Sequence, residues 1–146
     1  MNTRFTVAAH ILTLLAVFKD QALTSDFIAG SVETNPVVIR RLLGRLRDAG
    51  LVSALPGPGG GFVLTANPTT LTLLDVYQAV AERGLIAVHP GGSARCPVGR
   101  NIGSLLDEVT SQAEDAMLES LRATTVAALA QRVARFEKNR EGRKTR

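Results

Sequence analysis

The segment "NPVVIRRLLGRLRDAGLVSALPGPGGGFVLT", residues 35–65, decides the fold of this chain. Its first residue, Asn35, is a favoured helix N-cap, and Pro36 suits the first position of a helix. Gly50 is the residue type that commonly follows the last turn. These signals predict a helix from Pro36 to Ala49.

The two sides of this predicted helix differ in character. Apolar residues recur with the helical period and form a stripe that would anchor the helix to a core: Ile39, Leu42, Leu43 and Leu46. Successive residues of an α-helix are about 100° apart, so Val37, Arg41 and Gly44 lie opposite the stripe. Arg40 and Arg47 lie on one flank of the helix, and Val38 and Arg45 lie on the other. Taken alone, this pattern favours an arginine-rich helix that merely faces solvent. It also suits the DNA major groove, because arginine can donate two hydrogen bonds to guanine and valine can contact a thymine methyl group.

The segments on either side of this helix favour the DNA-binding interpretation. Before it, Thr24 or Ser25 can cap a short helix that runs to about Ser31. After it, the runs 51–55 and 62–65 are rich in β-forming residues, and the proline and glycine residues between them cannot be helical. The order of helix, turn, recognition helix and β-hairpin is that of a winged helix-turn-helix.

The hairpin tip is the second predicted contact with DNA. Gly59 and Gly60 lack side chains, so backbone N–H groups there could approach phosphates or the minor groove.

Most of the remaining chain is also predicted to be helical. Residues 4–18 form a helix that is apolar almost all round, which implies burial on more than one side. Thr72 and Asp75 resemble a capping box that opens a helix to about Ala81.

A long helix is predicted from Pro97 or Asn101 to Leu121, and a last helix begins at Thr124 or Thr125. Apolar positions of the long helix repeat by fours and threes: Ile102, Leu106, Val109, Ala113 and Ala116. This seam predicts contact with a second copy of the chain, as in a coiled coil. Packing within one chain is the alternative.

The stretch "VVIRRLLGRLRDAGLVSALPGPGGGFVLTANPTTLTLLDVYQAV", residues 37–80, resembles the Rrf2 family of winged helix-turn-helix regulators. The run "LRDAGLVS…GPGGGF" is specific, and the resemblance extends from the first helix to the long one. It implies a symmetric dimer held by the long helix, with the recognition helix in the major groove and the wing in the minor groove. It also implies base contacts by Val37, Val38, Arg40 and Arg41.

Two departures from the family pattern matter. Many members place an arginine at the wing tip where this chain has Pro56, which puts minor-groove readout by a side chain in doubt. Cluster-binding members carry three cysteines before the long helix, whereas this chain has only Cys96. An iron–sulfur cluster needs about four ligands, so no cofactor is expected.

Cys96 is the candidate regulatory thiol. The segment "HPGGSARCPVGRNI", residues 89–102, looks like the one-cysteine branch of the family, which makes thiol-based sensing plausible. Arg95 and Arg100 supply positive charge, and a helix N-terminus opened by Pro97 would favour the thiolate as well. A lone cysteine that serves as a small buried hydrophobe is the alternative.

Bulk properties exclude several other classes of protein. The chain has 146 residues, of which 45% are hydrophobic, and this composition favours a folded domain with a core. Its net charge of +4 favours a polyanionic partner. His89 has only Cys96 nearby as a metal ligand, so no metal site is predicted. No catalytic constellation is present, so the chain is not expected to be an enzyme. A single cysteine and apolar runs shorter than about 20 residues favour the cytoplasm over a membrane.

We therefore predict a mainly α fold with a small β-hairpin wing, a winged helix-turn-helix followed by a long C-terminal dimerisation helix. The predicted divisions are a DNA-binding domain at 1–83, a loop with the sensor cysteine at 84–100, dimerisation helices at 101–136 and a disordered basic tail at 137–146. The predicted protein is a dimeric regulator, expected to be a repressor, that binds a pseudo-palindromic operator in double-stranded DNA.

The predicted DNA contacts are Ser25, Asn35, Val37, Val38, Arg40, Arg41, Arg45, Gly59 and Gly60. Two alternatives stay open. One is a basic interaction protein that binds nucleic acid without sequence preference, and the other is a repressor controlled by a noncovalent small molecule.

Overall fold

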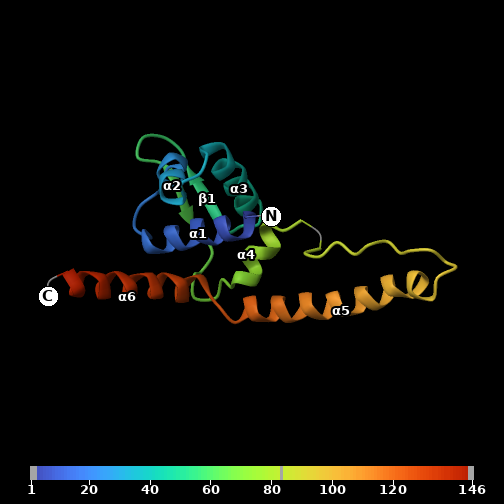
Figure 1. Cartoon of the computed structure of the whole chain (residues 1–146). Helices are drawn as coiled ribbons and strands as arrows, with labels where there is room; N and C mark the ends of the chain where they lie inside the picture. The colour runs from blue at the N-terminus through green and yellow to red at the C-terminus, as the bar shows by residue number, and fades with distance from the viewer. Residues whose placement is uncertain (1–2, 83, 145–146) are drawn as a thin grey trace. The chain divides into compact units, whose positions relative to one another are not determined.

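The computed structural model describes residues 3–82 and 84–144 (Figure 1). In these ranges the elements are α1 (Arg4–Val17), α2 (Ser25–Val32), α3 (Pro36–Asp48), β1 (Val52–Leu55), β2 (Gly61–Leu64), α4 (Leu73–Val80), α5 (Pro97–Arg122) and α6 (Val126–Lys144). The chain divides into two compact units. We call residues up to Ala81, together with those from Arg122 onward, the body, and residues 82–121 the arm. The mainly α architecture with a single hairpin confirms the predicted fold class.

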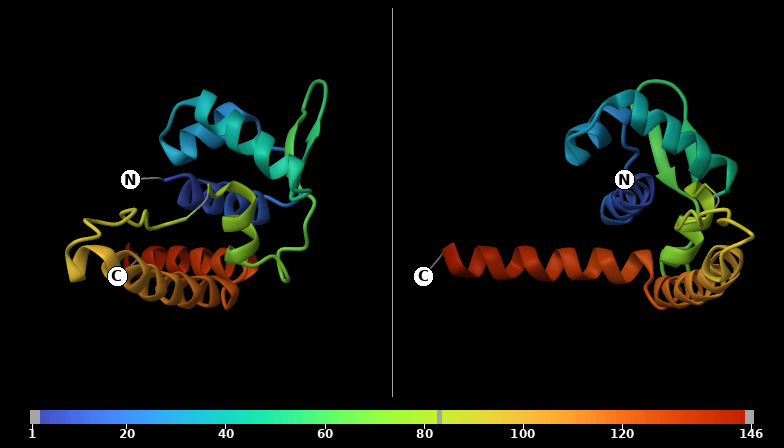
Figure 2. Two further views of the ribbon diagram at one scale, coloured as in Figure 1. Left: turned by 90° about the vertical axis from the view of Figure 1, so that its right-hand side faces the viewer. Right: turned by 45° about the vertical axis from the view of Figure 1, so that its right-hand side comes forward.

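Helix α1 lies at the centre of the body. The α2–α3 pair packs on one side of it and α6 on the other (Figure 2). Its buried stripe consists of Ala8, Ile11, Leu12 and Leu15. Because α6 begins with the fully buried Val126, both sides of α1 are covered by helices of its own chain. The predicted burial of α1 on more than one side is therefore confirmed, and helices of the same chain provide the cover.

The wing is an antiparallel pair in which Val52 lies opposite Leu64 and Leu55 opposite Gly61. A further backbone bridge ties it to the segment before α2. The N–H of Leu23 donates to the carbonyl oxygen of Phe62 at 3.0 Å, and the N–H of Phe62 donates to that of Leu23 at 2.8 Å. This bridge fixes the wing relative to the helix-turn-helix.

The predicted capping box opens α4. The Asp75 N–H donates to the Thr72 hydroxyl oxygen at 3.2 Å, and the Thr72 N–H donates to the Asp75 carboxylate at 2.9 Å. These two reciprocal bonds satisfy backbone N–H groups that the first turn of a helix leaves without partners. The prediction at this position is confirmed.

In the arm, α5 begins at Pro97, the earlier of the two predicted starts, so the predicted loop of residues 84–100 ends at residue 96. One oxygen of the Glu114 carboxylate accepts hydrogen bonds from the N–H groups of Leu85 and Ile86, at 2.9 and 3.2 Å. The loop is therefore fastened to the helix that follows it.

The predicted disorder of the basic tail is wrong for residues 137–144, because α6 continues to Lys144. Arginine, lysine and glutamate are good helix formers, and Arg140 lies 3.7 Å from Glu137 in an i,i+3 ion pair. Arg143 and Lys144 in the last turn also interact favourably with the negative end of the helix dipole. No helix in the described part of the chain is long and apolar enough to cross a membrane.

Candidate DNA-binding surface

Local signals start and stop the recognition helix α3. The side-chain oxygen of Asn35 accepts a hydrogen bond from the N–H of Val37 at 2.8 Å, and Pro36 occupies the first turn. Beyond the C-cap Ala49, Gly50 adopts a φ of 75°, a conformation that glycine takes without strain. The predicted helix is confirmed at both ends.

The preceding helix α2 is capped by Thr24, whose hydroxyl oxygen accepts a hydrogen bond from the N–H of Phe27 at 3.1 Å. Of the two predicted caps, Thr24 has this role, and Ser25 is the first residue of the helix. Ser25 is half-buried.

Two valines and two arginines gather on the first turns of α3. Val37 and Val38 are 53% and 41% exposed, although valine is usually buried. Arg40 and Arg41 are exposed beside them, while Ile39 on the opposite face is fully buried. The structure therefore brings together the four residues to which the family resemblance assigned base contacts.

The two arginines are held differently. A guanidinium nitrogen of Arg40 lies 3.8 Å from a carboxylate oxygen of Asp26 on α2, with both side chains mostly exposed. The side chain of Arg41 makes no hydrogen bond or ion pair with any residue in the ranges described. Its guanidinium is therefore available for an external partner.

Arg45, a further predicted DNA contact, lies one turn farther along α3. Its side chain is half-buried and donates a hydrogen bond to the carbonyl oxygen of Val80 at 3.2 Å. Sequence periodicity could not show this contact, because the position of α4 decides it. The structure does not group Arg45 with the exposed residues at the start of the helix.

Glycines shape the wing tip. Gly59 is exposed with a φ of 73°, and the N–H of Gly60 donates to the carbonyl oxygen of Gly57 at 3.0 Å. A Cβ atom on Gly60 would collide with the carbonyl oxygen of Leu55. The tip therefore presents backbone, as predicted, but the N–H of Gly60 is already used within the turn.

Gly61 positions the wing against the helix-turn-helix. Its φ is 151°, and a Cβ atom there would lie 2.5 Å from the carbonyl oxygen of Leu23. Only glycine permits this approach of the two backbones. Sequence reasoning missed this bridge because a single paired residue leaves no periodic signal.

Cys96 is exposed and directly precedes α5. Hydrogen bonds from the backbone N–H groups of Gly99 and Val98 lower the pKa of the Cys96 thiol below its ordinary value. The buried-hydrophobe alternative is therefore wrong. Of the two predicted causes, the shift therefore comes from the N-terminus of the helix that Pro97 opens and not from the charges of Arg95 and Arg100. The side chain of Arg100 donates to the carbonyl oxygen of Ala94 at 3.4 Å.

Three proteins illustrate what this chain resembles. YwnA of Bacillus subtilis strain 168, named as an HTH-type transcriptional regulator, is 39% identical over 122 residues, which cover 83% of this chain and 90% of YwnA. A solved structure described as a DNA-binding protein is 35% identical with a TM-score of 0.69, and the match covers 86% of this chain and 97% of that one. The structure of CymR, described as the global cysteine regulator of B. subtilis, is 26% identical with a TM-score of 0.65, over 90% and 95% of the two chains.

The model of the Rrf2 family, described as iron-dependent transcriptional regulators, matches residues 1–132. The donor set of this chain does not fit an iron–sulfur cluster, because its single cysteine supplies one of the about four ligands required. In residues 3–82 and 84–144, no three His, Cys, Asp or Glu side chains gather where they could hold a metal ion. On the extent of the family match and the identity to YwnA, this chain belongs to the Rrf2 family, whose members are transcriptional regulators rather than enzymes.

Proposed function

We propose that this regulator is a cytoplasmic homodimer that represses transcription by binding a pseudo-palindromic operator. The observation that carries the proposal is the exposed group formed by Val37, Val38, Arg40 and Arg41 at the start of α3. Half-exposed valines beside the available guanidinium group of Arg41 match the methyl groups and acceptor atoms of a major groove. Ser25, Asn35 and Gly59 would add contacts to the DNA backbone, whereas the predicted contact of Gly60 would require its N–H to leave the carbonyl oxygen of Gly57.

Exposed apolar residues on α5 support the dimer. No residue of this 26-residue helix is buried, and Leu105, Leu106 and Val109 are 56%, 43% and 62% exposed. A row of apolar side chains on one helix favours a second apolar surface as its cover. A second copy would supply that cover through the same helix and would present two recognition helices to successive major grooves, about one helical turn of DNA apart.

We further propose that oxidation of Cys96 lowers operator affinity. The exposed thiol and its lowered pKa favour the thiolate, which is the reactive form. The thiolate sulfur would attack one oxygen of hydrogen peroxide and break the O–O bond, which leaves a sulfenic acid while the other oxygen departs as water after taking up a proton. The added oxygen would disturb the hydrogen bonds that the sulfur accepts at the start of α5, the proposed dimer helix.

Operator selection followed by footprinting tests the DNA-binding proposal. Random DNA is enriched on the full-length protein, and the enriched site is protected from nuclease. We expect two symmetric half-sites, and affinity for the site at least about 10³-fold above that for unrelated DNA. A single asymmetric half-site would contradict the dimer. Equal affinities would instead favour the alternative of a basic protein that binds nucleic acid nonspecifically.

The thiol proposal has a separate test. Operator affinity of the wild type and of Cys96→Ser is measured before and after peroxide treatment. Only the wild type should lose affinity and regain it when a thiol reductant is added. An identical response of the two proteins would remove Cys96 from the regulation and favour control by a noncovalent ligand.

A further inference from the structure

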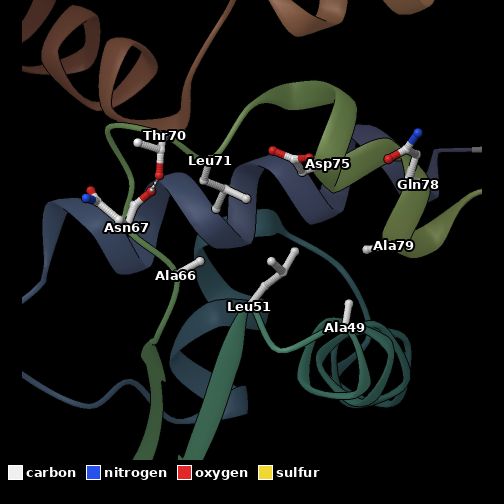
Figure 3. Close-up of a pocket in the computed structure, with 9 residues that line it drawn as sticks. All are labelled: Ala49, Leu51, Ala66, Asn67, Thr70, Leu71, Asp75, Gln78 and Ala79. Atoms are coloured by element: carbon white, nitrogen blue, oxygen red, sulfur yellow. Dashed lines mark hydrogen bonds between the residues drawn. The ribbon is translucent and has the colours of Figure 1, made fainter.

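We infer that the body carries a binding site for a small organic cation between the end of α3, the base of the wing and α4 (Figure 3). A pocket of about 420 Å³ opens there, within the about 300–1,000 Å³ common for small-molecule sites. Its apolar lining consists of Ala49, Leu51, Ala66, Leu71 and Ala79. This lining suits the apolar part of a ligand.

The polar groups of the pocket indicate the charge of that ligand. Asp75 is the one charged residue among those that line it. The carboxylate oxygen Oδ2 of Asp75 accepts both hydrogen bonds from Thr72, and no residue in the described ranges donates to the other oxygen. Gln78, one turn farther along α4, is exposed, and its side chain has no hydrogen-bond partner among those residues. A protonated amine or amidine could donate to both side chains.

The opposite wall is formed by the end of α3 and the base of the wing. Ala49 there is the C-cap of α3, and Arg45 and Arg47 in the last turn offset the partial negative charge that the end of a helix carries. Arg45 does not line the pocket, since its guanidinium donates to the carbonyl oxygen of Val80. The preference for a cation therefore rests on the carboxylate of Asp75, and the apolar lining would contact the apolar part of the ligand.

The pocket also lies where its occupation could influence DNA binding. The connector from Ala66 to Leu71 forms one wall, and backbone hydrogen bonds of 2.9 Å join this connector to the start of α6, from Val126 to Leu71 and from Ala127 to Pro68. A bound cation would thus contact the end of the recognition helix, the base of the wing and the connector together. This regulatory part of the inference rests on the proposed function, whereas the binding site does not.

Benzamidine, a planar cation with an apolar ring, is the probe for binding to the full-length chain. In a titration followed by amide NMR shifts, we expect changes at Leu51, Ala66 and Ala79 and a Kd of about 1 mM, typical of a fragment of this size. Neutral benzyl alcohol should bind at least about threefold more weakly. Absence of these shifts, or equal binding of the two probes, would overturn the inference.

Two substitutions locate the site. Asp75→Asn keeps an oxygen that can accept from Thr72 and removes the charge, so benzamidine should bind about threefold to fivefold more weakly. The matched control Asp107→Asn, on an exposed residue of α5, should leave the Kd unchanged. Ala79→Leu should fill the pocket and abolish binding, and it provides a second test if Asp75→Asn fails to fold. Unchanged binding by both pocket variants would refute the site.

The regulatory part is tested on the selected operator by fluorescence anisotropy. Saturating benzamidine should change the Kd of the wild type for the operator by about threefold or more, and should leave that of Ala79→Leu unchanged. An unchanged wild-type Kd would refute the regulation. Failure to bind any operator without benzamidine would instead count against the proposed function, which keeps the two failures distinguishable.

Discussion

Replacing Arg41 by alanine provides a direct test of the recognition face. Arg41 is exposed and has no hydrogen bond or ion pair among the described residues, so its loss should change the free energy of unfolding by less than about 0.5 kcal/mol. Each bidentate arginine–guanine contact contributes about 1 to 3 kcal/mol. A symmetric dimer would lose two such contacts, about 2 to 6 kcal/mol in total, so the Kd should rise about 30-fold or more.

The assay is fluorescence anisotropy on the selected operator and on a set of operators with single base changes. Arg41→Ala should relax the preference at one base position in each half-site. Arg47→Ala is the matched control, because it removes the same charge from the same helix, at a side chain that lies 3.5 Å from Asp48 and about two turns beyond the residues at the start of α3. Equal affinity and unchanged base preference in Arg41→Ala would refute the assignment of this face.

Four further predictions concern the DNA, the wing, α5 and the thiol. The logarithm of the operator association constant should fall linearly with the logarithm of salt concentration, by about 0.9 per phosphate contacted, and a flat response would exclude arginine–phosphate contacts. Gly61→Ala should lower the free energy of unfolding by about 2 kcal/mol, measured by thermal melts, because the new Cβ atom would collide with the carbonyl oxygen of Leu23. Gly30→Ala is the control and should not destabilise the chain, because a Cβ atom at this position of α2 would meet no neighbour. Val109→Glu should convert a dimer into a monomer in light scattering, while Glu108→Gln should not, and an unaffected dimer would place the interface elsewhere. The lowered pKa of Cys96 keeps the thiolate to lower pH, so the pH profile of its alkylation should shift to lower pH in the folded chain relative to the urea-unfolded chain, and coincident profiles would contradict the capping geometry.

The features that sequence predicted best depend on residues close together in the chain. The caps at Asn35 and at Thr72 with Asp75 are local signals, and the structure contains both as hydrogen bonds. The buried stripe of α3 follows from the helical period alone. Its opposite face, with Val37 and Arg41, was predictable for the same reason.

Features that depend on distant segments were missed. The contact of Arg45 requires the carbonyl group of Val80, 35 residues away, and the carboxylate of Glu114 reaches back to Leu85 across 29 residues. Neither contact has a signature in a local window. The helical tail was missed for another reason, since a run of charges describes composition and does not distinguish a solvated helix from a disordered segment.

The bridge between Leu23 and Phe62 has a mechanical consequence. Thr24, the cap of α2, directly follows Leu23, so the wing is attached one residue from the start of the helix-turn-helix. A two-stranded hairpin alone is only marginally stable in water, and the hydrogen bonds of this bridge connect the hairpin to a packed helix. Bending of the wing would therefore also displace the start of α2, so the wing and the helix-turn-helix should move together as one unit.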